Sequence, residues 1–226
     1  MNILKSDALQ GMTFLVTGAS SGIGKAAAIL LSECGARVVV NGRDEARLNQ
    51  TLSELKGAGH LASVASLENA DQTTDWLKSV LEQSGPLAGV FHCAGMELIR
   101  PARMIKQAQL NDVLGSSLFA AFGIARALSA KNALMDGGSI VFMSSVAGST
   151  GQVGMTAYSA AKAGIDGLVR SLACELASKK MRVNAIAAGA VHTAMHDRLT
   201  NGSGDEATLA YAQSHLLGFG QAEDVA

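Results

Sequence analysis

The chain has 226 residues, of which 48% are hydrophobic, 16% are charged and 4% are aromatic, and its formal net charge is -1. This length and apolar content suffice for one large α/β domain, and the lack of basic runs and aromatic clusters argues against a nucleic-acid partner. The three cysteines are far apart, no apolar run is long enough to cross a membrane and the first residues do not resemble a signal peptide, so we expect a cytoplasmic protein.

The first predicted unit is a strand, a glycine-rich loop and a helix. The apolar run MTFLVT predicts the strand, the loop GASSGIG follows it, and the helical segment KAAAILLSEC comes next. Gly18 permits a tight turn, Gly22 lets the backbone approach a pyrophosphate, and Gly24 allows close packing of helix on strand. Free N–H groups at the start of the helix favour a phosphate. The unit therefore predicts a dinucleotide site, and the alternative is a plain glycine-rich turn.

The residues after the second predicted strand, 37–40, bear on the choice of cofactor. An acidic residue at this place bonds a ribose 2′-hydroxyl and repels a 2′-phosphate, and a basic residue does the reverse. Here the strand is followed by Gly42 and Arg43, so the sequence favours NADP over NAD. The alternative is that Arg43 is a solvated residue at the start of the next helix, because Asp44 and Glu45 lie beside it.

Strands and helices continue to alternate along the chain. We expect further strands at 60–65, 87–92, 138–144 and 181–187, and further helices at 44–56, 70–83, 101–131 (with a break near Lys106) and 155–178. This alternation predicts a single-domain doubly wound parallel sheet over residues 1–226, a Rossmann fold with helices on both faces. The polar region 191–218 predicts a loop or lid over the pocket. The last residues, QAEDVA, resemble the first turn of a helix, so we expect a C-terminal piece to be missing.

A tyrosine and a lysine form the candidate catalytic pair. Tyr158 and Lys162 lie four residues apart in a helical segment, a spacing that places both side chains on one face. An ammonium group beside a phenol favours the phenolate, and a tyrosine needs such help because it otherwise ionises near pH ~10. Ser145 follows an apolar run at the carboxyl end of a predicted strand, where open α/β sheets bind ligands. By itself the spacing also fits a packed tyrosine and a solvated lysine, and the glycine loop favours the catalytic interpretation.

Three markers in this order resemble the short-chain dehydrogenase/reductase family. They are TGASSGIG, Ser145 and the segment YSAAK from Tyr158 to Lys162, and the resemblance extends from about residue 12 to the end of the chain. It is strongest to 3-oxoacyl-carrier-protein reductases and their sugar- and polyol-acting relatives. It implies an NADP(H)-dependent oxidoreductase that reduces a ketone or 3-oxoacyl-type carbonyl, or oxidises a secondary alcohol.

The resemblance also implies roles for single residues. Tyr158 would be the general acid and base, Lys162 would favour its phenolate and hold the nicotinamide ribose, and Ser145 would hydrogen-bond the substrate oxygen. Val191 and Thr193 would touch the carboxamide, and Arg43 would meet the 2′-phosphate. The implied cofactor-binding residues are Gly18, Ser20, Ser21, Gly22, Ile23, Gly24, Arg43, Ser66, Leu67, Cys93, Ala94, Gly95, Tyr158, Lys162, Gly189, Val191 and Thr193.

The sequence departs from the family pattern at four places. Ser66 stands in place of an aspartate, His92 and Cys93 in place of two asparagines, and Ala188 in place of a proline. Ser117 aligns with the catalytic asparagine that holds a water in the proton relay to the lysine. A serine can bond water, but with a shorter reach and one donor in place of two. We therefore expect an active enzyme with a modified relay, and the alternative is a nucleotide-binding scaffold or regulatory subunit with weak or no turnover.

Two further features concern metals and assembly. His192 and His196 have the spacing of a helical metal pair, with Asp197 beside the second, but no further ligand lies at metal spacing, so we expect no metal. The expected partner is a small carbonyl or alcohol substrate. The resemblance implies a homodimer or homotetramer that pairs through 106–131 and 155–178, which are rich in small residues.

Overall fold

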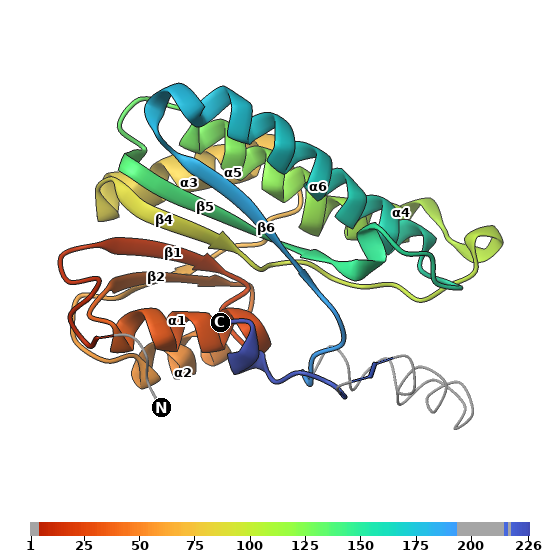
Figure 1. Cartoon of the computed structure of the whole chain (residues 1–226), viewed down its shortest axis with the longest axis horizontal. Coiled ribbons are helices and arrows are strands. Elements are labelled where there is room, and N and C mark those ends of the chain that lie inside the picture. Colours follow the sequence, from red (N-terminus) through yellow and green to blue (C-terminus); the bar gives the residue numbers. More distant parts are fainter. Residues whose placement is uncertain (1–4, 194–214, 217) are drawn as a thin grey trace.

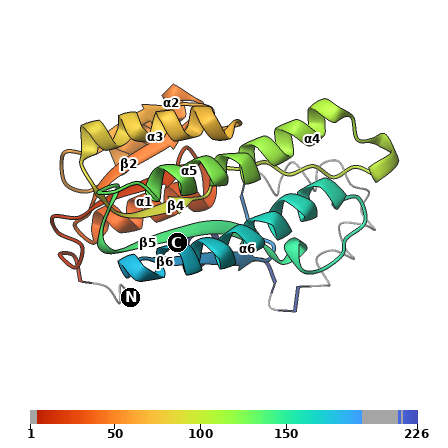
Figure 2. The same cartoon turned by 90° about the horizontal axis from the view of Figure 1, so that it is seen from above.

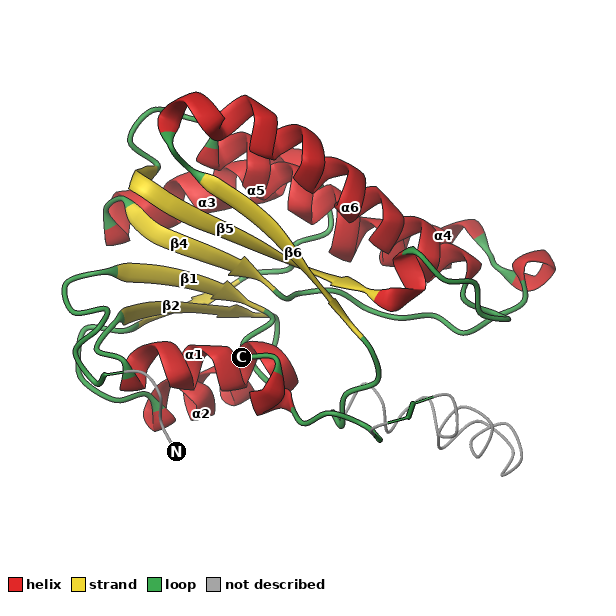
Figure 3. Ribbon diagram, viewed as in Figure 1, coloured by secondary structure: helices red, strands yellow, loops and turns green. Residues whose placement is uncertain are grey.

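The computed structural model describes residues 5–193, 215–216 and 218–226, and strands alternate with helices along it (Figure 1, Figure 3). The strands are β1 (Thr13–Thr17), β2 (Arg37–Gly42), β3 (Leu61–Val64), β4 (Leu87–His92), β5 (Leu134–Ser145) and β6 (Arg182–Ala188). The α-helices are α1 (Gly22–Glu33), α2 (Glu45–Glu54), α3 (Ala70–Ser84), α4 (Gln107–Leu114), α5 (Ala120–Leu128) and α6 (Thr156–Leu176). The predicted strands and helices are present with ends shifted by a few residues, except that the helix expected over 101–131 is divided.

The described strands form one parallel sheet in the order β3-β2-β1-β4-β5-β6. Helices α1 and α2 cover one face, and α3, α5 and α6 lie side by side on the other (Figure 1, Figure 2). The predicted doubly wound sheet is thus confirmed. The strand order reverses between β1 and β4, and open α/β sheets bind their ligands in the crevice at such a point.

Side chains of the inner strands alternate between two apolar layers. Leu15 and Val39 join the cluster formed with α3, α5 and α6, whereas Val16, Val38 and Val40 pack with α1 and α2. Full burial of such a side chain contributes about 1.5–3 kcal/mol. Because both faces of the sheet are buried, polar groups that meet a ligand must come from the strand ends and the loops that follow them.

The helix expected over 101–131 is divided into shorter pieces. A 3-10 turn, η1 (Ala102–Met104), precedes α4, and a π-helical turn, η2 (Gly115–Phe119), separates α4 from α5. Lys106 immediately precedes α4, so the predicted break is confirmed. The sequence did not predict the π-helical turn, a feature frequent at functional sites. The turn leads into α5, which lies very close to α3, because a Cβ on Gly123 of α5 would lie 2.6 Å from the carbonyl oxygen of Ala70 in α3.

Strand β5 is longer than predicted, since it begins at Leu134 and not at residue 138. The added residues pair with β4 through Leu87, and the register shifts between Leu87 and Gly89. Gly137 has a φ of 75° in this irregular part. A left-handed glycine lets the strand continue through a distortion that other residues resist.

The start of the region 191–218 meets the residues that follow it. Val191 forms a parallel bridge with Gly220, and the backbone N–H of His192 donates to the Gly220 carbonyl oxygen at 2.8 Å. Most of the predicted lid lies outside the described residues, as do His196 and Asp197. The final residues form a 3-10 turn, η5 (Ala222–Asp224), that packs against α1 (Figure 1).

The described residues were expected to hold neither a membrane span nor a metal ion. None of their helices is both long enough and apolar enough to span a bilayer. They also contain no group of three or more histidine, cysteine, aspartate or glutamate side chains that could hold a metal ion.

Candidate active site

A cleft of about 780 Å³ lies at the carboxyl ends of the strands, where the strand order reverses. Its walls come from the loop after β1, the segments after β2, β3 and β4, the end of β5, the start of α6 and the residues after β6. These segments are far apart in the sequence, and the parallel sheet brings them to one edge (Figure 3).

The glycine loop after β1 is closely packed against its surroundings. Gly18 and Gly22 have φ angles of 66° and 52°, in the left-handed region that favours glycine. A Cβ on Gly18 would lie 2.8 Å from the backbone nitrogen of Ala94, and a Cβ on Gly24 would lie 2.5 Å from the Gly18 carbonyl oxygen. The tight turn and the close packing of helix on strand predicted for these glycines are therefore confirmed.

Helix α1 begins in this loop, at the wall of the cleft. Its N-cap residue, Ser21, makes no side-chain capping hydrogen bond, and Gly22, Ile23 and Gly24 all line the cleft. The first N–H groups of a helix have no partner within the helix, and the helix dipole adds positive charge there. The start of α1 therefore suits the pyrophosphate of a dinucleotide.

The far end of the cleft lies beside β2 and β3 and holds groups of both charges. Arg43 and Arg47 line it from the β2 side, and Ser66, Leu67 and Glu68 line it from the β3 side. The sequence predicted Arg43, Ser66 and Leu67 at this place but missed Glu68. The sequence shows an acidic residue two positions after Ser66, but its nearness to Arg43 becomes evident only when β3 is known to pair with β2.

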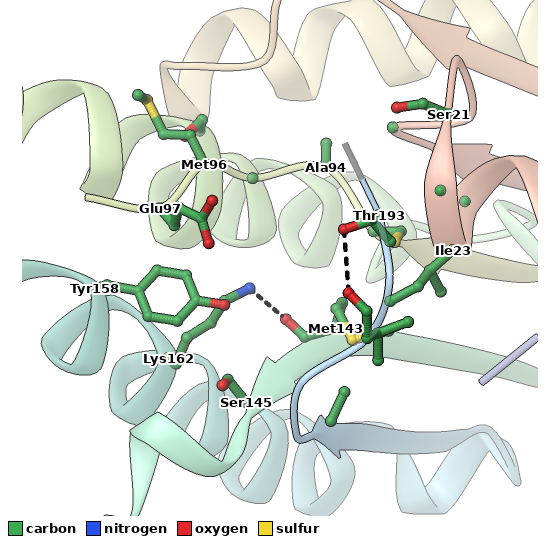
Figure 4. A pocket seen from close by; sticks show the side chains of 18 of the residues that line it. Ser21, Ile23, Ala94, Met96, Glu97, Met143, Ser145, Tyr158, Lys162 and Thr193 are labelled. Atoms are coloured by element: carbon green, nitrogen blue, oxygen red, sulfur yellow. Dashed lines mark hydrogen bonds between the residues drawn. The ribbon is translucent and has the colours of Figure 1, made fainter. Parts of the chain in front are cut away.

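Tyr158 and Lys162 project from α6 into the central part of the cleft, and Ser145 lies beside them at the end of β5 (Figure 4). The ammonium nitrogen of Lys162 lies 5.5 Å from the centre of the Tyr158 ring. The Ser145 hydroxyl oxygen accepts a hydrogen bond from the N–H of Ala147 at 3.2 Å, so its own proton can point to a ligand. Met96 and Glu97 form the facing wall.

Lys162 is a buried cation, with 4% of its surface exposed. Its ammonium group donates to the carbonyl oxygen of Met143 at 2.7 Å (Figure 4). Burial lowers the pKa of Lys162 to about 8, against the opposing influence of Cys93 and Asp166. Lys162 is thus mostly charged at pH 7, at a cost in desolvation that a surface lysine does not have.

Ser117 lies beneath the cleft and not on its wall. It is fully buried in the π-helical turn, and its hydroxyl has no hydrogen-bond partner among the described residues. The position that a Cβ of Gly95 would take is 3.0 Å from the Ser117 hydroxyl and 3.8 Å from the Lys162 ammonium group. The absence of a side chain at Gly95 therefore leaves the space between the two polar groups open, and an unpartnered hydroxyl at this depth can bond a water.

His92 links this turn to the glycine loop. The N–H of Ala94 donates to the Thr17 hydroxyl at 3.2 Å, and that hydroxyl lies 2.8 Å from Nδ1 of His92. The Nε2 atom lies 3.4 Å from the carbonyl oxygen of Ser117. The Thr17 hydroxyl can therefore donate to Nδ1 while Nε2–H donates to the carbonyl, which assigns the neutral Nε2–H tautomer. The sequence noted the histidine but missed this chain of contacts.

Because of this buried histidine, we expect the free energy of unfolding to fall in acid. Burial, and then the charge of Lys162, lower the pKa of His92 to about 3, although the Ser117 carbonyl opposes this. Between pH ~3 and ~6.5 the unfolded chain binds the extra proton, so stability falls as the pH falls, by about 2 kcal/mol at pH 5. Urea unfolding at pH 7 and pH 5 should show this loss in the wild type, and a His92→Asn variant should lose about 2 kcal/mol less. Equal losses in the two proteins would contradict the assignment to His92.

The cleft gathers the residues that the sequence proposed for the cofactor. All of them line it: Gly18, Ser20, Ser21, Gly22, Ile23, Gly24, Arg43, Ser66, Leu67, Cys93, Ala94, Gly95, Tyr158, Lys162, Gly189, Val191 and Thr193. Of the candidate catalytic residues, Ser145, Tyr158 and Lys162 line it too, and Ser117 does not. Burial raises the pKa of the Cys93 thiol to about 11, so this thiol is neutral at pH 7.

Comparison with known proteins identifies the family. Residues 12–204 match the family described as short chain dehydrogenase. Over 215 residues the chain is 33% identical to the 3-oxoacyl-(acyl-carrier-protein) reductase FabG of Staphylococcus aureus, covering 94% of this chain and 86% of the relative. Over 195 residues it is 33% identical to carbonyl reductase family member 4 of Danio rerio, covering 86% of this chain and 80% of the relative.

Solved structures give the same result. A dehydrogenase/reductase from Sinorhizobium meliloti superposes with a TM-score of 0.85 at 30% identity, covering 97% of this chain and 86% of the other. A short-chain dehydrogenase from Shigella flexneri, solved in complex with NADP, superposes with a TM-score of 0.81 at 28% identity, covering 97% and 90%. From its sequence match, its fold and its relatives, the chain belongs to the short-chain dehydrogenase/reductase family, oxidoreductases that act on alcohol or carbonyl groups with NAD(P).

Proposed function

We propose that this protein is an NADP(H)-dependent oxidoreductase that reduces a ketone or 3-oxoacyl-type carbonyl, or oxidises the corresponding secondary alcohol. The observation that carries the proposal is one cleft that contains both the glycine loop and the group Ser145, Tyr158 and Lys162. The names of the reductase and carbonyl reductase relatives support a carbonyl substrate.

The described residues fit a dinucleotide. The start of α1 would hold the pyrophosphate, since its N–H groups are uncapped and the glycines leave room for close approach. Arg43 would meet the 2′-phosphate, and Val191 and Thr193 would contact the carboxamide at the other end. When bound, the nicotinamide supplies or accepts the hydride.

The protein's own residues would position the carbonyl and move the proton. Ser145, whose oxygen already accepts from Ala147, donates its hydroxyl proton to the substrate oxygen. Tyr158 gives a proton to that oxygen in reduction and removes it in oxidation. Lys162 favours the tyrosinate by its charge and holds the ribose, and Ser117 bonds the water through which the proton reaches solvent.

The chain would act as a single dinucleotide-binding domain, in the cytoplasm, with a small-molecule substrate. It would form a homodimer or homotetramer through the helices α4, α5 and α6. Exposed apolar side chains on this side, Phe119 at 42% and Phe122 at 51%, support pairing there.

A screen of ketones with NADPH tests the function and separates it from the alternative of a scaffold with little turnover. The alternative is motivated by Ser117, which is buried beneath Gly95. We expect the wild type to oxidise NADPH with at least one ketone, and Ser117→Asn to change kcat by less than about tenfold, because either side chain can bond a water. An inactive wild type that becomes active as Ser117→Asn would favour the scaffold, and inactivity of both with every ketone would refute the proposal.

A further inference from the structure

The end of the cleft beside β2 and β3 places a carboxylate next to the arginine that would bind a 2′-phosphate. Strands β2 and β3 are neighbours in register, and the N–H of Ala65 donates to the Gly42 carbonyl oxygen at 3.1 Å. Arg43 follows β2, and Glu68 follows β3 at the same edge. A guanidinium nitrogen of Arg43 lies 3.8 Å from a carboxylate oxygen of Glu68.

Glu68 is held in this place from two sides. Its carboxylate accepts a hydrogen bond of 2.6 Å from the Ser66 hydroxyl. Its backbone packs against the π-helical turn, where a Cβ on Gly115 would lie 2.7 Å from the Glu68 carbonyl oxygen. The carboxylate is therefore directed to the cleft by a bonded neighbour and a fixed backbone.

The ion pair itself can be broken at little cost. The side chains of Arg43 and Glu68 are 69% and 51% exposed. Exposed pairs of this kind contribute about 0–1 kcal/mol because water screens them. Arg43 can therefore leave Glu68 for a stronger anion, such as a phosphate dianion.

The end of β2 carries no acidic group of its own and leaves little room for a side chain. A Cβ on Gly42 would lie 3.2 Å from the Cβ of Ser20, so a larger residue at this position would press on the glycine loop. In dinucleotide sites, an acidic side chain here accepts from the ribose 2′-hydroxyl of NAD, and a nearby arginine accommodates the 2′-phosphate of NADP. In this chain the basic group, Arg43, follows β2, and the acidic group, Glu68, follows the neighbouring strand β3.

We propose that Glu68 sets the selectivity between NADP and NAD, an inference that rests on the proposed function. Glu68 weakens NADP binding, because the 2′-phosphate must draw Arg43 away and then lie near a second negative charge. It accommodates NAD, because its carboxylate neutralises Arg43 and can accept from the 2′-hydroxyl. The protein therefore binds both dinucleotides, with a preference for NADP smaller than Arg43 and Arg47 alone would give.

Dissociation constants for NADPH and NADH, measured by calorimetry on the full chain, test the proposal without depending on turnover. We expect Glu68→Gln to tighten NADPH binding about three- to tenfold. The same change should weaken NADH binding by less than about threefold. The gain should shrink to less than about twofold in 0.5 M salt. Arg43→Gln should weaken NADPH binding about tenfold or more and leave NADH within about twofold.

Glu54→Gln is the matched control. Glu54 also pairs with a cation, Lys25, at 2.8 Å and is 39% exposed, but it does not line the cleft. This variant should leave both constants unchanged. Equal effects of Glu68→Gln on the NADPH and NADH dissociation constants, or no effect on either, would overturn the role of Glu68 but not the proposed function. Failure of the wild type to bind either dinucleotide would overturn the proposed function as well.

Discussion

Replacing Tyr158 with phenylalanine is expected to lower kcat for ketone reduction by about 10²–10⁴-fold while NADPH binding changes by less than about threefold. The substitution removes only the hydroxyl, which is the group that would exchange a proton with the substrate oxygen. The ring stays on α6 beside Lys162, so the shape of the cleft is retained. Steady-state kinetics with NADPH and calorimetric binding on the same preparation measure the two quantities.

Ser159→Ala is the control for this change. Ser159 is the next residue of the same helix, carries a hydroxyl and does not line the cleft. Its loss should leave kcat and NADPH binding within about twofold, the range of an ordinary surface change. Turnover of Tyr158→Phe within about tenfold of the wild type would remove Tyr158 from the acid–base role. Loss of NADPH binding together with turnover would point to a role in binding instead.

Replacing Lys162 with methionine should abolish turnover and, at the same time, stabilise the cofactor-free protein. The folded pKa of Lys162 is lowered to about 8 from 10.5, so keeping the buried ammonium group charged at pH 7 costs about 3 kcal/mol. Methionine avoids this cost but loses the hydrogen bond to Met143, worth about 1 kcal/mol. The net gain of about 2 kcal/mol corresponds to an increase in Tm of about 4–8 °C.

The sign of the pH dependence gives a second test of the same variant. Between pH ~8 and ~10.5 the unfolded wild type holds the proton that the folded protein releases, so wild-type stability rises with pH relative to Lys162→Met. The cost of the charge falls to about 1.4 kcal/mol at pH 9.5, so the advantage of the variant should almost vanish there. Scanning calorimetry at both pH values measures it, and an advantage independent of pH would refute the burial argument.

Lys179→Met provides the comparison. Lys179 also donates to a backbone carbonyl, that of Ser129, at 2.7 Å, but on the exposed surface. It has no desolvation cost to recover, so its loss should leave Tm unchanged or slightly lower. An equal increase in Tm in Lys162→Met and Lys179→Met would show that methionine raises Tm irrespective of burial. Together with the loss of turnover, a stabilising Lys162→Met would indicate that the fold holds a buried charge for function and not for stability.

Most of the fold and much of the cleft could be predicted from local patterns in the sequence. Alternating apolar runs and helical segments gave the doubly wound sheet, because each pattern spans few residues and depends on burial of one face or two. The glycine loop was readable because Gly18 and Gly24 have conformational and packing roles that other residues cannot take. The spacing of Tyr158 and Lys162 was readable because helical geometry places them on one face.

Other features depended on contacts between distant parts of the chain. The π-helical turn and the burial of Ser117 beneath Gly95 arise where the helix packs on the segments after β3 and β4. No local pattern distinguishes such a turn from a regular helix. The placement of Ser117 below the wall of the cleft therefore came only from the structure.

The sequence by itself determined the family, the glycine loop and the tyrosine–lysine pair, since each depends on residues close together in the chain. Only the tertiary structure decided which charges meet at the end of the cleft and which groups His92 joins. Glu68 lies beside Arg43 because β3 pairs with β2, and His92 lies between Thr17 and Ser117 because β4 pairs with β1 and lies beneath the π-helical turn. Strand order and register set these neighbours, and both follow from packing of the whole chain.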